Sequence, residues 1–471
     1  MGKKRRWIPA VLCLAICFLA GCMDSGKQEA GETEPHTSTE ASSESESGTS
    51  EEEGGKPEPG TSAEESSEAE PDTGAEESGG TEPSEIPAVQ PALPVILDGA
   101  QIQEKNRISF GMEDNGMEDL ETCQFWDADQ IRAMIEAYSI PDYPFYGGRP
   151  RTEQDDRALL ASRNLEALQD PAEIRFGVIV SNADMRAFPV ETALTEEASS
   201  AEFDYLQETM LGIGEGVAVC HQTADGSYSF VQGYQYRGWI QTDCIAFCSL
   251  EEMKAYLDAA DFVVITEAAV EIRGRKLRMG TRLPVSGEGE AEWYAELPVR
   301  KEDGSFGTET AGIPKNGSSK GYLPYTEENL VGQARKMLGQ PYGWGDRNGN
   351  WDCSSTMNGI FRCCGILMPR NTSQLTSSAA SVTDLSGMSA EEKRSAVIRS
   401  GPGSMILIPG HVVMYAGEEN GRSMIIHNVA AYSVDGGVMK TVMQCQYTPM
   451  DIYAAGGVNY MDLYTAVIRF E

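Results

Sequence analysis

The sequence predicts an α+β protein in which a helical N-terminal region precedes one or two small β-barrels and a C-terminal domain of helices and strands. Three patterns support this fold class. Apolar residues recur at helical spacing within residues 91–170, short strands separated by turns fill much of residues 171–324, and both periods occur in residues 325–471. The chain has 471 residues, which is enough for several domains.

Residues 1–22 have the features of a secretory signal. Four basic residues at positions 3–6 precede a short apolar run, and small residues stand directly before Cys22. The run is too short to cross a membrane, because a spanning helix needs about 20 apolar residues. We therefore expect a lipoprotein that is extracytoplasmic and anchored to the outer face of the cell membrane only through a lipid on Cys22.

Residues 23–90 are rich in Glu, Ser, Gly, Thr and Pro, and they hold twenty acidic side chains against two basic ones. Such a segment cannot bury enough apolar surface to offset its chain entropy, so we expect a disordered acidic tether. The whole chain has a formal net charge of −36. This negative charge argues against binding to nucleic acid and against docking on anionic lipid.

Residues 91–170 are expected to form a helical support region. Ile131, Met134, Ile135 and Tyr138 recur at helical spacing behind Asp127, which is a good N-cap residue. This region contains no pattern typical of catalysis.

Residues 171–250 change to the pattern of a small barrel, because short strands at residues 176–180, 216–219 and 229–231 alternate with turns. The same region contains three cysteines and a histidine that raise the alternative of a zinc site: Cys220, His221, Cys244 and Cys248. Their spacing is looser than that of typical structural zinc sites, and cysteine is often buried for packing alone. We expect no metal.

Residues 182–186, 203–204, 225–226 and 236–240 resemble a bacterial SH3-like, wall-associated domain. Residues 260–324 look like a second and more divergent barrel of the same kind.

The cysteine at position 353 lies at a predicted helix start. Met357, Ile360, Phe361 and Cys364 follow Cys353 at helical spacing. A helix start concentrates unpaired backbone N–H groups and the positive end of the helix dipole. Both favour a thiolate, and the N–H groups can also stabilise the oxyanion that forms when a carbonyl is attacked. The pattern predicts a nucleophilic cysteine.

Two of the four histidines of the chain lie in the same domain as Cys353. His411 and His427 stand on predicted consecutive strands, with a turn at residues 418–423 between them. Adjacent antiparallel strands can bring such rings into contact. We assign His411 as the base that takes the Cys353 proton and His427 as the residue that orients the first imidazole.

Residues 325–471 resemble the NlpC-type cysteine peptidases, which are compact papain-like α+β domains that hydrolyse bacterial peptidoglycan peptides. The resemblance is carried by residues 341–345, 352–355, 368–374, 410–412 and His427. It implies the catalytic triad Cys353, His411 and His427. It also implies hydrolysis of the bond between γ-D-glutamate and the diamino acid, through a thioester intermediate and without a cofactor.

The same resemblance implies a set of oxyanion and substrate contacts. Tyr342 matches the residue near the oxyanion, and Trp344, Asp352 and Ser354 match residues that line the cleft. In similar enzymes an SH3-like domain forms a wall of the cleft and favours stem peptides with a free N-terminal L-alanine, a contact for which Tyr236 is the candidate. Ser355 and Asn428 depart from the commonest family pattern.

Two other interpretations of the sequence remain open. The barrels could bind wall polymer in a protein without turnover, or the same thiol chemistry could serve an amidase or acyltransferase. Residues 346–352 also resemble a calcium loop, but the glycine is misplaced and the bidentate glutamate is missing, so a turn is the better interpretation. We expect a monomer.

Overall fold

The computed structural model describes residues 95–112, 115–199 and 202–470. The predicted signal, the tether and the lipidation site Cys22 lie outside the described residues. None of the described helices is long and apolar enough to cross a membrane.

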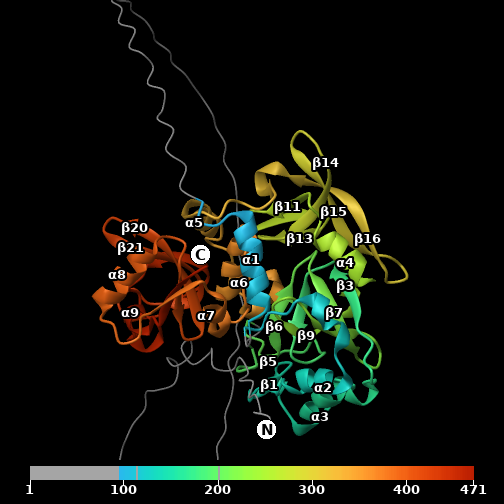
Figure 1. The fold of residues 1–471 in the computed structure, drawn as a ribbon. Coiled ribbons are helices and arrows are strands. Elements are labelled where there is room, and N and C mark those ends of the chain that lie inside the picture. Colours follow the sequence, from blue (N-terminus) through green and yellow to red (C-terminus); the bar gives the residue numbers. More distant parts are fainter. Residues whose placement is uncertain (1–94, 113–114, 200–201, 471) are drawn as a thin grey trace, which may run out of the picture. The chain divides into compact units, whose positions relative to one another are not determined.

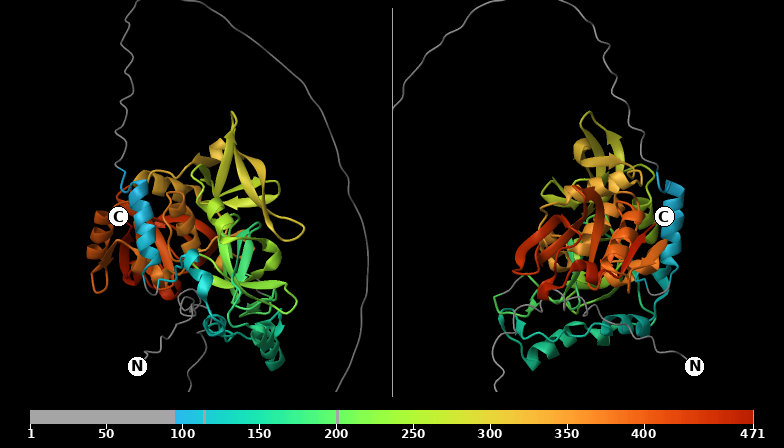
Figure 2. Two further views of the ribbon diagram at one scale, coloured as in Figure 1. Left: turned by 45° about the vertical axis from the view of Figure 1, so that its right-hand side comes forward. Right: turned by 90° about the vertical axis from the view of Figure 1, so that its left-hand side faces the viewer.

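The N-terminal region does contain helices, but they pack on different parts of the molecule. Helix α1 (Gly99–Phe110) lies against the C-terminal domain (Figures 1 and 2), where the Asn106 side chain donates to the Gly365 carbonyl and accepts from the Leu367 N–H. Helix α2 (Ala128–Glu136) begins behind its predicted cap, Asp127. The apolar face of α2 is buried against the first barrel. Helix α3 (Glu153–Ser162) comes next along the chain. The predicted support region is therefore shared between two neighbours.

The first barrel is a seven-stranded antiparallel sheet in the order β10-β3-β7-β8-β9-β4-β6. Its strands are β3 (Arg175–Ile179), β4 (Ala183–Arg186), β6 (Gln207–Leu211), β7 (Gly216–Gln222), β8 (Tyr228–Gln232), β9 (Arg237–Gln241) and β10 (Ile245–Cys248). Alternate residues such as Val217, Val219 and Val231 fill its interior. A small sheet of β1 (Phe145–Tyr146), β2 (Arg149–Pro150) and β5 (Leu194–Thr195) flanks the barrel.

Helix α4 (Leu250–Leu257) leads into the second strand-rich unit. The unit has a five-stranded antiparallel sheet in the order β16-β15-β14-β11-β17 and a separate hairpin. The sheet strands are β11 (Phe262–Ile265), β14 (Arg282–Glu288), β15 (Glu292–Arg300), β16 (Phe306–Pro314) and β17 (Ser318–Lys320), and the hairpin is β12 (Ala269–Ile272) with β13 (Arg275–Arg278). The strands predicted in this region are therefore present.

The C-terminal domain packs helices on a six-stranded sheet in the order β18-β23-β19-β20-β21-β22. Its strands are β18 (Ser381–Asp384), β19 (Met405–Ile408), β20 (His411–Glu419), β21 (Arg422–Tyr432), β22 (Lys440–Pro449) and β23 (Ala466–Arg469). Its helices are α5 (Glu327–Lys336), α6 (Cys353–Arg362), α7 (Leu375–Ser378), α8 (Ala390–Ser400) and α9 (Tyr460–Leu463).

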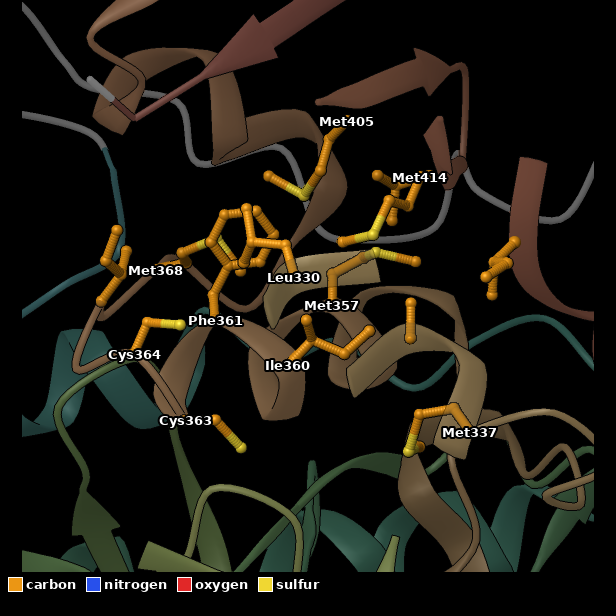
Figure 3. Packing of buried hydrophobic residues seen from close by; sticks show 14 of the residues in the cluster. Leu330, Met337, Met357, Ile360, Phe361, Cys363, Cys364, Met368, Met405 and Met414 are labelled. Carbon is orange, nitrogen blue, oxygen red and sulfur yellow. The ribbon is translucent and has the colours of Figure 1, made fainter. Parts of the chain in front are cut away.

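Helix α6 is the central element of this domain. Its residues Met357, Ile360 and Phe361 are buried in one cluster with Leu330 of α5 and Met414 of β20 (Figure 3). Nearly every residue of α6 is buried, because the second unit covers its remaining side. At that contact Gly280 has a left-handed backbone with φ of 81° and lies directly against α6.

The contact at Gly280 can be tested by adding one methyl group. A Cβ at this position would lie 2.7 Å from the Arg362 Cβ and 3.0 Å from the Gly359 carbonyl oxygen. We expect Gly280→Ala to lower the free energy of unfolding, in urea titrations, by about 2 kcal/mol more than Gly274→Ala. Gly274 is the matched control. It also has a left-handed backbone, with φ of 73°, but a Cβ added there would have no neighbour within 4 Å. Equal losses would show that this contact does not hold α6.

Candidate active site

The predicted nucleophile lies where the sequence placed it, at the first residue of α6. Asp352 caps the helix by accepting a hydrogen bond of 2.8 Å from the Ser355 N–H, and the Ser355 hydroxyl accepts from the Asp352 N–H. Cys353 is 9% exposed. Because the cap occupies the N–H of Ser355, the earlier N–H groups of the first turn are the ones available to an oxyanion.

The two predicted histidines are in contact. His411 begins β20, His427 lies in the paired strand β21, and the His411 Nε2 is 3.1 Å from the His427 Nδ1. The predicted hairpin between them is therefore confirmed. His427 is fully buried, whereas the His411 ring retains some exposure.

Thr448 of β22 extends this pair, and no sequence motif predicts its role. Its Oγ1 lies 3.2 Å from the His427 Nε2. When the His427 Nε2 donates to Thr448, the His427 Nδ1 is left as an acceptor. The His427 Nδ1 can then accept a hydrogen bond only if the neutral His411 ring carries its hydrogen on Nε2. In this tautomer the His411 Nδ1 has a lone pair that can accept a proton. This order of hydrogen bonds prepares His411 to act as a base.

Burial determines the charge of this pair. It lowers the pKa of His411 to about 4, and burial followed by the charge of His411 lowers the pKa of His427 well below its usual value. Both rings are therefore neutral near pH 7. Neutral imidazole is the form that can accept a proton.

Helix α6 packs against the two strands that carry the histidines. Residues Val412 and Met414 face α6 and share a buried cluster with Cys353, whereas Val413 and Tyr415 lie in the cluster on the other face of the sheet. The His411 ring lies against Tyr460 of that second cluster, 6.2 Å between ring centroids. His411 stands at the start of β20, and its ring lies on the side of this second cluster.

Asn428, a departure from the family pattern, points to α6. Its side-chain amide donates to the Trp351 carbonyl at 3.0 Å and to the Thr356 hydroxyl at 3.3 Å. It therefore ties β21 to the start of α6, and a small residue at this position would lose both bonds.

Arg370 is a buried cation beside the nucleophile, and no pattern in the sequence indicates its role. It is 5% exposed, and its guanidinium donates to the Ser354 hydroxyl at 2.6 Å and to Asp352 Oδ2 at 2.5 Å. Burial works against its charge, but Asp352 and then Asp346 outweigh this effect and raise the pKa of Arg370, with the Cys353 sulfur acting in the same direction. A permanent positive charge therefore acts on Cys353.

Residues Trp344–Gly349 form a tight turn, as the sequence predicts. Four of these residues have left-handed backbones: Gly345, Asp346, Asn348 and Gly349. The Asp346 carboxylate bonds to Arg278 at 3.1 Å and to Arg370 at 3.4 Å. Burial would raise the pKa of Asp346, but Arg278 and Arg370 lower it, so the side chain is a carboxylate. A strained loop of this kind persists only when its surroundings hold it.

The predicted cleft residues meet aromatic side chains of the first barrel. Tyr342 lies 6.2 Å from Phe203, and Trp344 lies 6.5 Å from Tyr205, between ring centroids. These contacts place the first barrel beside the turn that carries Trp344.

Tyr236, the candidate for substrate contact, has an acidic partner that was not anticipated. Its hydroxyl donates to Glu208 Oε2 at 2.5 Å. Burial raises the pKa of Glu208, partly offset by the hydrogen bond from Tyr236 and by the charge of Arg370. Glu208 lies in β6 between Gln207 and Thr209, both of which bond to the C-terminal domain.

The zinc alternative in the first barrel is not supported by the geometry. His221 bonds to the Asn164 carbonyl at 2.9 Å. Within the described ranges no group of three or more His, Cys, Asp and Glu side chains is arranged to hold a metal ion.

Comparisons with known proteins agree with this geometry. Residues 339–448 match the model of the NlpC/P60 family, and residues 192–241 match that of an SH3 domain (SH3b1 type). Among solved structures, an NlpC/P60 endopeptidase from Photobacterium damselae subsp. piscicida has 17% identity and a TM-score of 0.62, covering 80% of this chain and 94% of that chain. An NlpC/P60 family protein from Bacillus cereus ATCC 10987 has 17% identity and a TM-score of 0.45. This match covers 63% of the present chain and 99% of the Bacillus chain. No curated protein matches the chain.

These matches and the cysteine at the start of α6 define the class of the protein, which is a cysteine peptidase of the cell wall with an SH3-like domain. Residues 339–448, within its C-terminal domain, carry the similarity to the NlpC/P60 family.

The lowered pKa of His411 leads to a prediction on stability. The unfolded His411 binds a proton near its ordinary pKa of about 6.5, and the folded ring does so only near 4. Between these values the unfolded state binds more protons, so lowering the pH from 6.5 to 4 favours unfolding. We expect this one residue to remove about 2 kcal/mol, less than the full shift because the ring is partly exposed.

Urea titrations of the wild type and of His411→Gln across this pH range measure the effect. The glutamine variant should lose less stability on acidification, because the carboxylates titrate alike in both proteins. Identical pH dependences would contradict the assignment of a buried neutral ring.

Proposed function

We propose that this protein hydrolyses the peptide stems of peptidoglycan between γ-D-glutamate and the diamino acid, with Cys353 as nucleophile. The observation that carries the proposal is the combination of a cysteine at the start of α6 with a contiguous chain of hydrogen-bonding groups from His411 through His427 to Thr448. The choice of the bond between γ-D-glutamate and the diamino acid rests on the resemblance to NlpC-type peptidases.

The proposed reaction has two steps. His411 Nδ1 takes the thiol proton, and the Cys353 sulfur attacks the γ-carbonyl carbon of the glutamyl residue. First-turn N–H groups of α6 and Tyr342 stabilise the oxyanion. His411 then protonates the leaving amine, which departs with the diamino acid and leaves a thioester. Water, deprotonated by the same ring, hydrolyses the thioester and restores the thiol.

Arg370 and the two carboxylates beside it prepare this site. The positive end of the α6 dipole and the Arg370 charge both favour a negative sulfur. The Asp352 carboxylate would oppose a thiolate next to it, but its charge is neutralised by the bond to Arg370 at 2.5 Å. His427 and Thr448 hold His411 in the tautomer that accepts the proton.

The proposed substrate contact is the Tyr236–Glu208 pair of the first barrel. A stem peptide with a free N-terminal L-alanine ends in an ammonium group, and a half-buried carboxylate such as Glu208 is a suitable partner for it. The pair would thus restrict cleavage to peptides whose N-terminus is free.

We also propose that the enzyme acts outside the cytoplasm as a monomer, held to the membrane by a lipid on Cys22. The signal pattern of residues 1–22 supports this proposal, and the acidic segment of residues 23–90 would give the enzyme reach into the wall.

Replacement of the nucleophile tests the reaction. Cys353→Ala should abolish cleavage of an L-Ala-γ-D-Glu-diamino acid peptide, followed by mass spectrometry of the products, without lowering the thermal midpoint of unfolding by more than a few degrees. Cys248→Ala is the matched control, since burial raises the pKa of the Cys248 thiol to about 12 and it should remain unreactive near pH 7. Normal turnover by the Cys353 variant would refute the proposal, and transfer of the acyl group from the thioester to an added amine rather than to water would indicate an acyltransferase.

Replacement of Glu208 tests the substrate contact. Glu208→Gln keeps the shape but removes the charge, so kcat/KM for the free-amine peptide should fall about tenfold or more, and that for the N-acetylated peptide should change little. If both peptides lose activity equally, Glu208 does not select the free amine.

A further inference from the structure

Thr209 connects the first barrel to the buried charges at the nucleophile. It lies in β6 and is 1% exposed. Its Oγ1 accepts a hydrogen bond of 2.6 Å from the Arg370 Nε and donates to Asp346 Oδ2 at 3.3 Å. One hydroxyl group of the barrel therefore joins a cation and an anion of the catalytic domain.

Arg370 connects Thr209 to the start of α6 through its hydrogen bonds. Its three nitrogen atoms have separate acceptors, since Nε donates to Thr209, Nη1 donates to the Ser354 hydroxyl at 2.6 Å, and Nη2 donates to Asp352 at 2.5 Å. Asp352 and Ser354 are the residues on either side of Cys353. A planar guanidinium bound at three points has one orientation, and this orientation determines where its charge lies relative to the sulfur.

The second strand-rich unit contributes Arg278 to the same cluster of buried charges, which also contains Arg370, Asp346 and Asp352. The Arg278 guanidinium bonds to Asp346 Oδ1 at 3.1 Å, donates to the Asn350 carbonyl at 2.8 Å and stacks 3.6 Å above the Trp351 ring. Two guanidinium groups and two carboxylates thus balance in a region that is almost fully buried. Arg278 comes from a third part of the chain, so the cluster is complete only when both strand-rich units and the catalytic domain are in contact.

We propose that Thr209 is a positioning residue for the reaction, so that the first barrel contributes to turnover as well as to substrate binding. Its hydroxyl holds Arg370 in the orientation that fixes Asp352, Ser354 and the first turn of α6. Because Thr209 is buried, it cannot touch the substrate and must act through Arg370. The inference rests on the proposed peptidase function.

Without the hydroxyl, the Arg370 Nε–H would be a buried donor with no acceptor. Such a group is costly, so the guanidinium should turn towards another acceptor and weaken its bonds to Asp352 and Ser354. The charge beside the sulfur would shift, and the thiolate would be less favoured. Substrate contacts at Tyr236 and Glu208 would be unchanged. The expected signature is a loss in kcat with little change in KM.

The test uses Thr209→Val in the full chain, because valine keeps the shape of threonine and removes the hydroxyl. We expect kcat to fall about tenfold with KM within about twofold of the wild type. The rate at which iodoacetamide alkylates Cys353, located by peptide mass spectrometry, should rise with pH at a midpoint higher than that of the wild type by about half a unit. Thr209→Ser keeps the hydroxyl and should restore both values.

Thr242→Val is the matched control. Thr242 is a buried threonine of the same barrel, 8% exposed, whose hydroxyl bonds to the Ser229 hydroxyl at 2.9 Å rather than to the catalytic domain. It should behave as the wild type in both assays. If circular dichroism shows that Thr209→Val is unfolded, Thr209→Ala is measured in its place with the same expectations.

Several results would overturn the inference. These are equal kcat and equal alkylation midpoints in Thr209→Val and Thr242→Val, a change in KM alone, or failure of Thr209→Ser to restore them. The alkylation assay needs no substrate. It therefore separates failure of this inference from failure of the proposed peptidase activity, which would appear as a lack of cleavage by the wild type.

Discussion

The ion pair between Arg370 and Asp352 is the interaction on which the site depends. Asp352 begins α6 by capping its first turn, and the same carboxylate is neutralised by Arg370, so the nucleophile stands beside a fixed cation rather than an unpaired anion. Breaking one partner of such a buried pair typically costs about 3 to 5 kcal/mol. The pair also explains why the segment after α6 and the turn before it are folded back onto the helix start.

Much of this arrangement could be predicted from the chain itself. The period of the apolar residues after Cys353 predicts α6 and its buried face, and the alternation around His411 predicts the strand and its partner. These are local patterns, and local hydrogen bonding decides them. The resemblance to a known family predicts the residues of the cleft, and the first barrel does lie beside one of them, Trp344.

The partners of those residues could not be predicted in the same way. Thr448, Arg370 and Glu208 act through contacts with residues far away in the sequence, and nothing in their immediate neighbourhood marks them. A threonine in a strand or an arginine after a proline has many possible roles. Only the packing of three parts of the chain around the turn at residues 344–349 shows which role each side chain has. The N-terminal region was likewise predicted as helical, but its division between two neighbours follows from tertiary contacts.

The first described residues have a mechanical consequence. The Ile96 N–H donates to the Tyr325 carbonyl at 2.8 Å, at the point where the catalytic domain begins, and Asn106 of α1 is bonded to the loop after α6. Any tension transmitted through the preceding chain would therefore load the catalytic domain directly. The contacts that the two strand-rich units make with the active site involve other residues, so such tension would not act on them first.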